Sequence, residues 1–293
     1  DVSLDRNRLN NRWPLAIVTG DDGVVFDQLL TVVGEVPPRR FNGLDKAFGP
    51  QYIRGIEEGN GNPPGEHLWN TYSMNKEDLW VSRTRIPVTG TVTALVSENF
   101  NDKASADELE WWNLHVPQWA PINIVQDPHK AGNKCLELRD EDPYDYALAE
   151  RAFPESRQIS IEFRVLAAQV GHGGLEVEVQ DRQGRRPVNL RLKDHWIEQA
   201  YLTRGADAIA VPAQEWLHLR LELDCAAGQY TVFLNGKEVT SKLAFAEKVE
   251  TVERLVFRTG PWRGDVRSAY LDGEPWPFGC NQEDLAGADL RVP

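Results

Sequence analysis

Residues 217–224 of this chain read LHLRLELD. The four leucines stand at alternate positions, with polar residues between them. Successive side chains of a β-strand point to opposite faces of the sheet, so this pattern predicts a strand with one buried face. The nearby segment 229–239 (QYTVFLNGKEV) carries Asn235-Gly236, a tight-turn signal between two strands. This stretch therefore predicts an antiparallel β-sheet.

The same alternation recurs through residues 92–293. In GLEVEVQ, Leu175, Val177 and Val179 alternate with polar residues, and a turn with Gly184 follows. A helical period is almost absent, so six or more such strands predict a two-sheet jelly roll. The expected strands include 158–165, 174–181, 186–192, 216–224, 229–239 and 253–259.

Residues 1–91 have shorter strands and more turns. A Gly-Asp-Asp-Gly turn between the first two apolar runs signals a hairpin. This spacing predicts one blade and part of another of a β-propeller. The expected fold class is therefore all-β, with a partial propeller in residues 1–91 and a jelly-roll sandwich in residues 92–293. The strands expected in the first part are 15–18, 24–26, 29–36, 67–75 and 78–88.

The composition is that of a globular protein of 293 residues, long enough for two domains or one large one. No apolar run approaches about 18 residues, so no membrane insertion is expected. The net charge of −13 would repel phosphates, which argues against a nucleic acid partner. Ten tryptophans are typical of a β-rich protein whose aromatics either stack on a ligand or fill sandwich cores.

The three cysteines, Cys135, Cys225 and Cys280, are too widely spaced for a metal-ligand pattern or a disulfide framework. Cys225 ends a strand-like run and is expected to be a buried thiol. The sequence opens with Asp1 rather than Met, so the chain is expected to be a processed product or a fragment.

An acidic segment offers a metal-site hypothesis. Asp140, Asp142 and Asp145 lie within six residues of one another, and their hard oxygen ligands would suit a structural Ca²⁺. The alternative is an acidic turn that pairs with neighbouring arginines or docks on the first domain. No other cofactor is expected.

Three tryptophans, Trp111, Trp112 and Trp119, form an aromatic cluster in LEWWNLHVPQWAP. If exposed, they would stack on sugar rings as in a carbohydrate-binding module. If buried, they would pack the two domains together.

The second region resembles the concanavalin A-like (laminin-G-like) sandwich. The resemblance rests on the ENFND opening, the paired WLHLRLELD and QYTVFLNGKEV strands, and the final ERLVFRTGP. This sandwich serves lectins, enzymes and spacers, so the resemblance implies a fold and leaves the function open.

The first region resembles the last blade of sialidase-like glycoside hydrolases with BNR repeats. Its block TGDDGVVF is similar to the Asp-box of that repeat, which ties a hairpin turn with side-chain hydrogen bonds. The segments FNGLDKAFGPQYIRGIEEGNG and YSMNKEDLWVSRTRIPV extend the resemblance over residues 10–90.

This resemblance implies roles for individual residues. Tyr72 would be the nucleophile, Glu58 (or Glu57) the base that activates it, and Arg54 a clamp for the substrate carboxylate. The acid/base aspartate and a further clamp arginine would come from blades absent from the chain. The alternatives are a Tyr72 packed between blades and a surface ion pair between Arg54 and Glu58.

Other polar residues of the same region would support the site. Arg40 and Lys46 would add positive charge. Lys76, Glu77 and Asp78 would form a fixed polar network, or else a solvated β-turn. Trp69 would form a wall on which a sugar stacks, or else part of the blade core. The candidates for substrate binding are Arg40, Lys46, Trp69, Lys76, Glu77 and Asp78.

Together these features predict the C-terminal part of a secreted or periplasmic exo-glycosidase that cleaves an acidic sugar. The fragment alone would be inactive, because a propeller builds its site from all of its blades. Its expected partners are a carbohydrate and the missing N-terminal blades, in cis or as a separate chain. Three alternatives remain: a carbohydrate-binding module without catalysis, a lyase in which Tyr72 transfers a proton and Arg54 neutralises a uronate, and a structural interdomain piece.

Overall fold

The structure, a computed structural model, describes the chain in segments. No helix in these segments is long and apolar enough to cross a membrane. The chain divides into two compact units, unit 1 (Asp1–Gly90 with Glu274–Trp276) and unit 2 (Thr91–Gly273 with Pro277–Pro293). The described residues are 14–34, 36–37, 49–56, 65–88, 90–142, 145–169, 174–196, 199–204, 207–212, 214–260 and 289–292.

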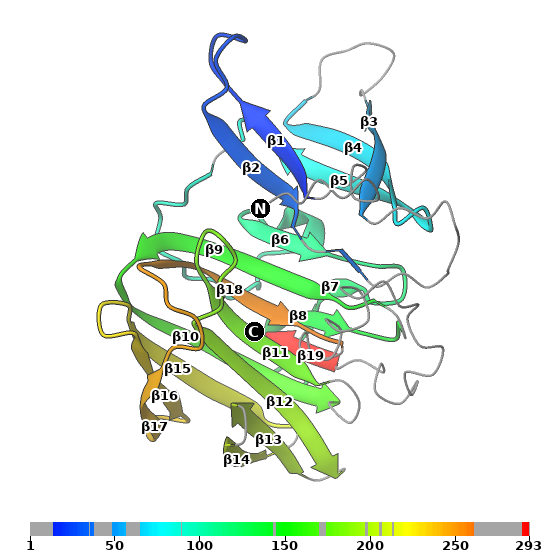
Figure 1. The fold of residues 1–293 in the computed structure, drawn as a ribbon. Coiled ribbons are helices and arrows are strands. Elements are labelled where there is room, and N and C mark those ends of the chain that lie inside the picture. Colours follow the sequence, from blue (N-terminus) through cyan, green and yellow to red (C-terminus); the bar gives the residue numbers. More distant parts are fainter. Residues whose placement is uncertain are drawn as a thin grey trace, which may run out of the picture. The chain divides into compact units, whose positions relative to one another are not determined.

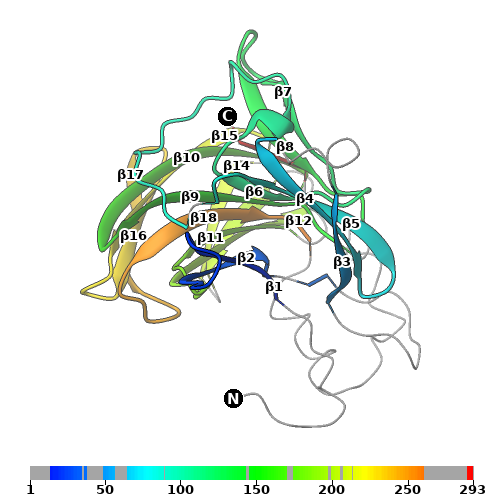
Figure 2. The same ribbon diagram turned by 90° about the horizontal axis from the view of Figure 1, so that it is seen from above.

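Unit 2 is a sandwich of two antiparallel sheets, and Figures 1 and 2 show its strands in two stacked, curved layers. One sheet has the order β17 (Lys237–Ala244), β16 (Gln229–Leu234), β15 (Trp216–Asp224), β10 (Gln158–Gln169), β19 (Asp289–Val292), β8 (Lys134–Arg139), β7 (Ile122–Gln126). The other has the order β14 (Asp207–Pro212), β13 (Gln199–Arg204), β12 (Val188–Trp196), β11 (Leu175–Gln180), β18 (Val252–Arg258), β9 (Leu148–Ser156), β6 (Trp112–His115). This confirms the predicted all-β fold.

The core lies between these sheets. The leucines of β15 are almost fully buried, and Leu219 pairs across the ladder with Phe163 of β10. Phe163 in turn meets Phe257 edge to face at 5.3 Å, which joins the two sheets. Each such side chain contributes about 1.5–3 kcal/mol by leaving water. The alternation in residues 217–224 therefore marks a core strand, as predicted.

The predicted turns of unit 2 form by the expected chemistry. Asn235 and Gly236 both have positive φ (50° and 81°) and connect β16 to β17. In the other turn the Asp181 carboxylate accepts the backbone N–H groups of Gln183 and Arg185 at 2.9 and 2.8 Å.

Strand β11 differs from the expected half-exposed strand, because both of its faces are buried. Glu176 and Glu178 lie opposite the core and have no exposed surface. Arg258 neutralises Glu176 at 3.6 Å, and Arg186 neutralises Glu178 at 3.3 Å. A charge removed from water has to be paired, so these ion pairs permit the burial.

Unit 1 contains a hairpin of β1 (Leu15–Thr19) and β2 (Gln28–Val33), and a three-stranded sheet of β3 (Pro50–Ile56), β4 (His67–Met74) and β5 (Asp78–Arg85). The β4–β5 pair is as predicted. The first hairpin is not, because Val24–Phe26 lie in the loop and β1 pairs with Gln28–Val33 instead. The reason is Asp22, whose carboxylate accepts the N–H groups of Val24 and Val25 at 2.8 and 2.7 Å.

Candidate functional site

The predicted sialidase-like site falls partly on the β3–β4–β5 sheet. Of its residues, Arg40, Lys46, Glu57 and Glu58 lie outside the described residues. The others occupy β3, β4 and the turn between β4 and β5.

The register of this sheet separates Arg54 from Tyr72. Arg54 pairs with Thr71, and Tyr72 is the next residue of β4. Directly paired residues share a face, whereas consecutive residues point to opposite faces. The structure therefore does not bring the proposed clamp and the proposed nucleophile together on this sheet.

The face with Arg54 is basic and aromatic. Trp69 belongs to this face because it stands two residues before Thr71, and its cross-strand partner is Arg83. The Arg83 guanidinium lies over the Trp69 ring, 5.8 Å from its centroid. Arg54 and Arg83 are exposed. We call Arg54, Trp69, Arg83 and Arg85 the arginine face.

The opposite face is the core of unit 1. Tyr72 is 2% exposed and packs with Leu15 and Met74. Its hydroxyl lies 2.7 Å from Ser82 Oγ. Burial raises the pKa of Tyr72, and the Ser82 hydrogen bond only partly offsets this effect. In this environment the phenolate that nucleophilic attack requires is disfavoured at neutral pH.

The turn between β4 and β5 is a structural connection. Asn75 and Lys76 both have positive φ, and Glu77 N–H donates to the Met74 carbonyl at 2.9 Å. The buried Asn75 side chain accepts the Gly49 N–H at 2.8 Å and donates to the Pro37 carbonyl at 2.9 Å. Lys76 and Glu77 are half-buried, and Asp78 is exposed.

The acidic segment of unit 2 is buried and internally hydrogen-bonded. Asp140 accepts from the Asp142 N–H and from the Thr259 hydroxyl, at 3.0 and 2.8 Å. Asp145 accepts from its neighbour's N–H and lies 2.9 Å from His115 Nε2. Burial, with smaller contributions from Asp142 and Asp145, raises the pKa of Asp140 to about 7.

These contacts bear on the calcium hypothesis. In the described part of the chain, no three His, Cys, Asp or Glu side chains are grouped as metal ligands. Several carboxylate oxygens of Asp140, Asp142 and Asp145 instead accept protein hydrogen bonds. The predicted Ca²⁺ site stays a prediction.

The tryptophan cluster is split between core and surface. Trp112 packs on the core beside Phe100, with ring centroids 5.9 Å apart. Trp111 and Trp119 are 47% and 56% exposed. Trp111 precedes β6 and Trp119 follows it, so they stand beyond opposite ends of that strand.

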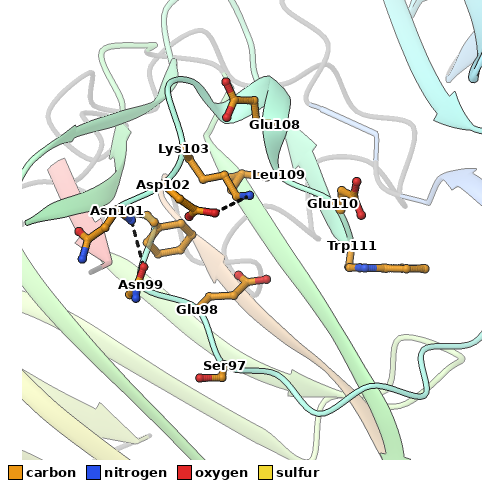
Figure 3. A pocket seen from close by; sticks show the side chains of 11 residues that line it. Ser97, Glu98, Asn99, Asn101, Asp102, Lys103, Glu108, Leu109, Glu110 and Trp111 are labelled. Atoms are coloured by element: carbon orange, nitrogen blue, oxygen red, sulfur yellow. Dashed lines mark hydrogen bonds and ion pairs between the residues drawn. The ribbon is translucent and has the colours of Figure 1, made fainter.

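Trp111 lines a pocket of about 560 Å³ in unit 2. Figure 3 shows Trp111 and Glu110 on one side of it and Asn99 and Asn101 on the other. A short 3-10 turn, η2 (Ala106–Glu108), lies between the two lining segments and ends at the pocket. The lining residues are Ser97, Glu98, Asn99, Phe100, Asn101, Asp102, Lys103, Glu108, Leu109, Glu110 and Trp111.

Side-chain and backbone contacts connect this pocket to the sandwich. Glu98 accepts from Trp112 Nε1 at 2.6 Å and pairs with Arg151 at 2.9 Å. The Trp111 carbonyl accepts the Ala152 N–H at 3.3 Å, which holds Trp111 beside β9. Glu98 and Arg151 therefore anchor the pocket to the sandwich.

Two aromatic residues of the pocket have strained backbones. Phe100 has φ 55° and Trp111 has φ 65°. Positive φ is rare for bulky residues and costs about 1–3 kcal/mol, and such strain gathers at functional sites. Trp111 is 47% exposed, whereas Phe100 is buried.

Comparison with known protein families identifies unit 2. The family model "Sialidase-like, CBM domain" matches residues 112–265, more than half of the chain. The chain belongs to this family. The match covers the strands of the sandwich from β6 to β18 and begins directly after the pocket-lining segment.

One solved structure supports a sialidase-like all-β protein. A structure entitled "Sialidase" is 33% identical, with a TM-score of 0.81, over 96% of this chain. The match covers 25% of that protein, so the chain spans about a quarter of its length. A GH131 β-glucanase catalytic domain from Podospora anserina is 13% identical over 69% of this chain and 93% of its own, with a TM-score of 0.42. No curated protein matches the sequence.

Sequence reasoning found Trp111 but not the residues that hold it. Glu98 and Arg151 are 53 positions apart. Glu98 belongs to the ENFND segment, which was expected to open the second region and which also supplies one wall of the pocket. The one available signal was this segment's density of Asn, Asp and Glu beside two tryptophans.

Proposed function

We propose that unit 2 is a carbohydrate-binding module and that the Trp111 pocket is its glycan site. The observation that carries this proposal is an exposed tryptophan with positive φ that lines a pocket of polar and apolar groups, directly before the residues that match a CBM family. Tryptophan offers a flat apolar face and makes large contact areas with little loss of conformational freedom.

The chemistry of the pocket suits a sugar ring. The C–H face of a pyranose would stack on Trp111, and its hydroxyls would meet the carboxylates and amides of the lining. Hydrogen bonds to ionised acceptors are roughly twice as strong as neutral ones. Asn99 and Asn101 also offer both donors and acceptors to a polyhydroxyl ligand.

The test compares two exposed tryptophans. We expect Trp111→Ala to weaken glycan binding at least about fivefold, because stacking on an aromatic residue is worth about 1 kcal/mol or more. Trp119→Ala is the matched control, since Trp119 is similarly exposed but does not line the pocket. Binding would be measured by calorimetry. An equal loss in both variants would place the site elsewhere.

The proposal for the longer protein is a secreted or periplasmic exo-glycosidase that acts on an acidic sugar and is inactive in this chain alone. The likeness to a sialidase at 33% identity supports it. In this hypothesis unit 1 is part of a propeller with Asp-boxes, and further blades of the longer protein cover the β3–β4–β5 sheet. Unit 2 is a concanavalin A-like sandwich. Leu29, Leu79 and Val24 are each more than 70% exposed, which favours further β-structure packed on unit 1.

A further inference from the structure

We infer that the Trp111 pocket selects a neutral glycan and rejects an acidic one. This inference rests on the proposed carbohydrate-binding function and adds the class of ligand. It means that the sandwich would not recognise the acidic sugar that a sialidase removes. It would recognise the uncharged part of the glycan that carries this sugar, or that remains after its removal.

The charge of the pocket lining is the first observation. Glu98, Asp102, Glu108 and Glu110 contribute four carboxylates to the lining, and Lys103 contributes its single basic side chain. Figure 3 shows Asp102 beside Lys103, with Glu108 and Glu110 on the other lining segment. The excess of acidic groups persists over the whole chain, whose net charge is −13.

The second observation is that the nearby cations are already engaged. Lys103 Nζ lies 3.2 Å from an Asp102 oxygen. Lys134 Nζ donates to the Lys103 carbonyl, and Arg151 pairs with Glu98 and with backbone carbonyls. An incoming carboxylate would therefore have to share each of these cations with an acceptor that the protein already supplies.

The carboxylates are meanwhile held in place by the protein. Glu108 accepts the Ala104 N–H at 3.1 Å across η2. Glu98 accepts from Trp112 and Arg151. Fixed carboxylates can accept hydrogen bonds from sugar hydroxyls at little entropic cost, but they repel a second negative charge at close range.

The arginine face of unit 1 provides a chemical contrast within the same chain. Arg54 and Arg83 are exposed there beside Trp69. A planar guanidinium meets a carboxylate with paired hydrogen bonds, so an acidic sugar would suit that face and not the pocket. The preference of the pocket is therefore a property of its own lining.

The experiment uses the full chain and matched glycans. The probes are neutral galactose-, N-acetylgalactosamine- and glucose-terminated oligosaccharides, each with a counterpart capped by sialic acid. We expect at least one neutral probe to bind tenfold or more tightly than its capped form at pH 7, by calorimetry. Higher salt should narrow the gap, because it screens the repulsion.

The variants Glu108→Gln and Glu110→Gln test the cause. Glutamine keeps the size and an acceptor oxygen but removes the charge. The capped probe should therefore bind more tightly than it does to the native chain, while the neutral probe should bind somewhat more weakly because it loses a charge-assisted hydrogen bond. Trp111→Ala should weaken both probes of a pair.

Three outcomes overturn the inference. Equal or tighter binding of the capped probes would contradict the selectivity but leave carbohydrate binding intact. Unchanged discrimination in both glutamine variants would contradict the role of the pocket charges. Binding to none of the probes by a folded chain would contradict the proposed function itself.

Discussion

At the scale of single residues, the sequence context of Tyr72 and its position in the structure indicate different roles. Its sequence context resembles that of a nucleophile, but its ring fills the core of unit 1 and its hydroxyl meets Ser82. We expect Tyr72→Phe to cost about 0.5–1.5 kcal/mol, the net worth of one hydrogen bond. Tyr72→Ala should cost about 3–5 kcal/mol, because it leaves a cavity. Urea unfolding followed by tryptophan fluorescence measures both.

The same variant tests the catalytic hypothesis in the longer protein. If Tyr72 is the nucleophile, Tyr72→Phe will abolish hydrolysis in a folded enzyme. Activity at the wild-type level would show that Tyr72 is a packing residue and would direct attention to other blades.

Asp140 predicts a pH dependence of stability. Its pKa is raised from an ordinary value of 3.8 to about 7, so the folded state binds a proton that the unfolded state releases. Stability is therefore highest below about pH 4 with respect to this group and falls as the pH rises toward 7. In the presence of a chelator, the unfolding midpoint should fall over this range, and less steeply in Asp140→Asn.

The calcium hypothesis makes the opposite demand on this carboxylate. A bound Ca²⁺ would favour the ionised form of Asp140, and a ligand of the folded state raises the midpoint with its concentration. A midpoint at pH 7.5 that does not respond to millimolar Ca²⁺ would contradict the predicted site.

At the scale of elements, local patterns predicted the strands but not their long-range partners. The leucines of β15 identify a core strand because alternation is a local property. The pairing of β1 with β2 was missed because Asp22 lengthens the loop with its own side chain. The burial of Glu178 was missed because its partner Arg186 comes from beyond a turn. The pocket was missed because Arg151 joins Glu98 across 53 positions.

Asn75 offers a test of one such long-range connection. Its side chain bonds Gly49 and Pro37 while its backbone has φ 55°. Asn75→Ala should destabilise unit 1 by about 2–4 kcal/mol, from two lost hydrogen bonds and a left-handed alanine. Asn75→Gly is the control, since glycine tolerates positive φ but makes neither hydrogen bond. Equal losses would show that the side-chain hydrogen bonds, and not the backbone conformation, dominate.

At the scale of the whole molecule, the two units carry different chemistry. Unit 1 presents the arginine face, and unit 2 presents the acidic pocket with Trp111. The sequence suggested a division near residue 91 because alternating strands begin there. The substrate-binding residues were expected in the first region, with a carbohydrate-binding sandwich as an alternative, because exposure of a tryptophan is decided by packing and not by local pattern.

The final prediction is that unit 2 binds glycan without unit 1. Every residue that lines or anchors the pocket lies between Ser97 and Ala152, within unit 2. A chain that begins at Thr91 should therefore keep the glycan affinity of the full chain within about twofold, since it retains all of these residues. The arginine-face variant Arg54→Ala, made in the full chain, should leave this affinity unchanged. A shortened chain that folds, by its circular dichroism, but binds ten times more weakly would show that unit 1 contributes to the site.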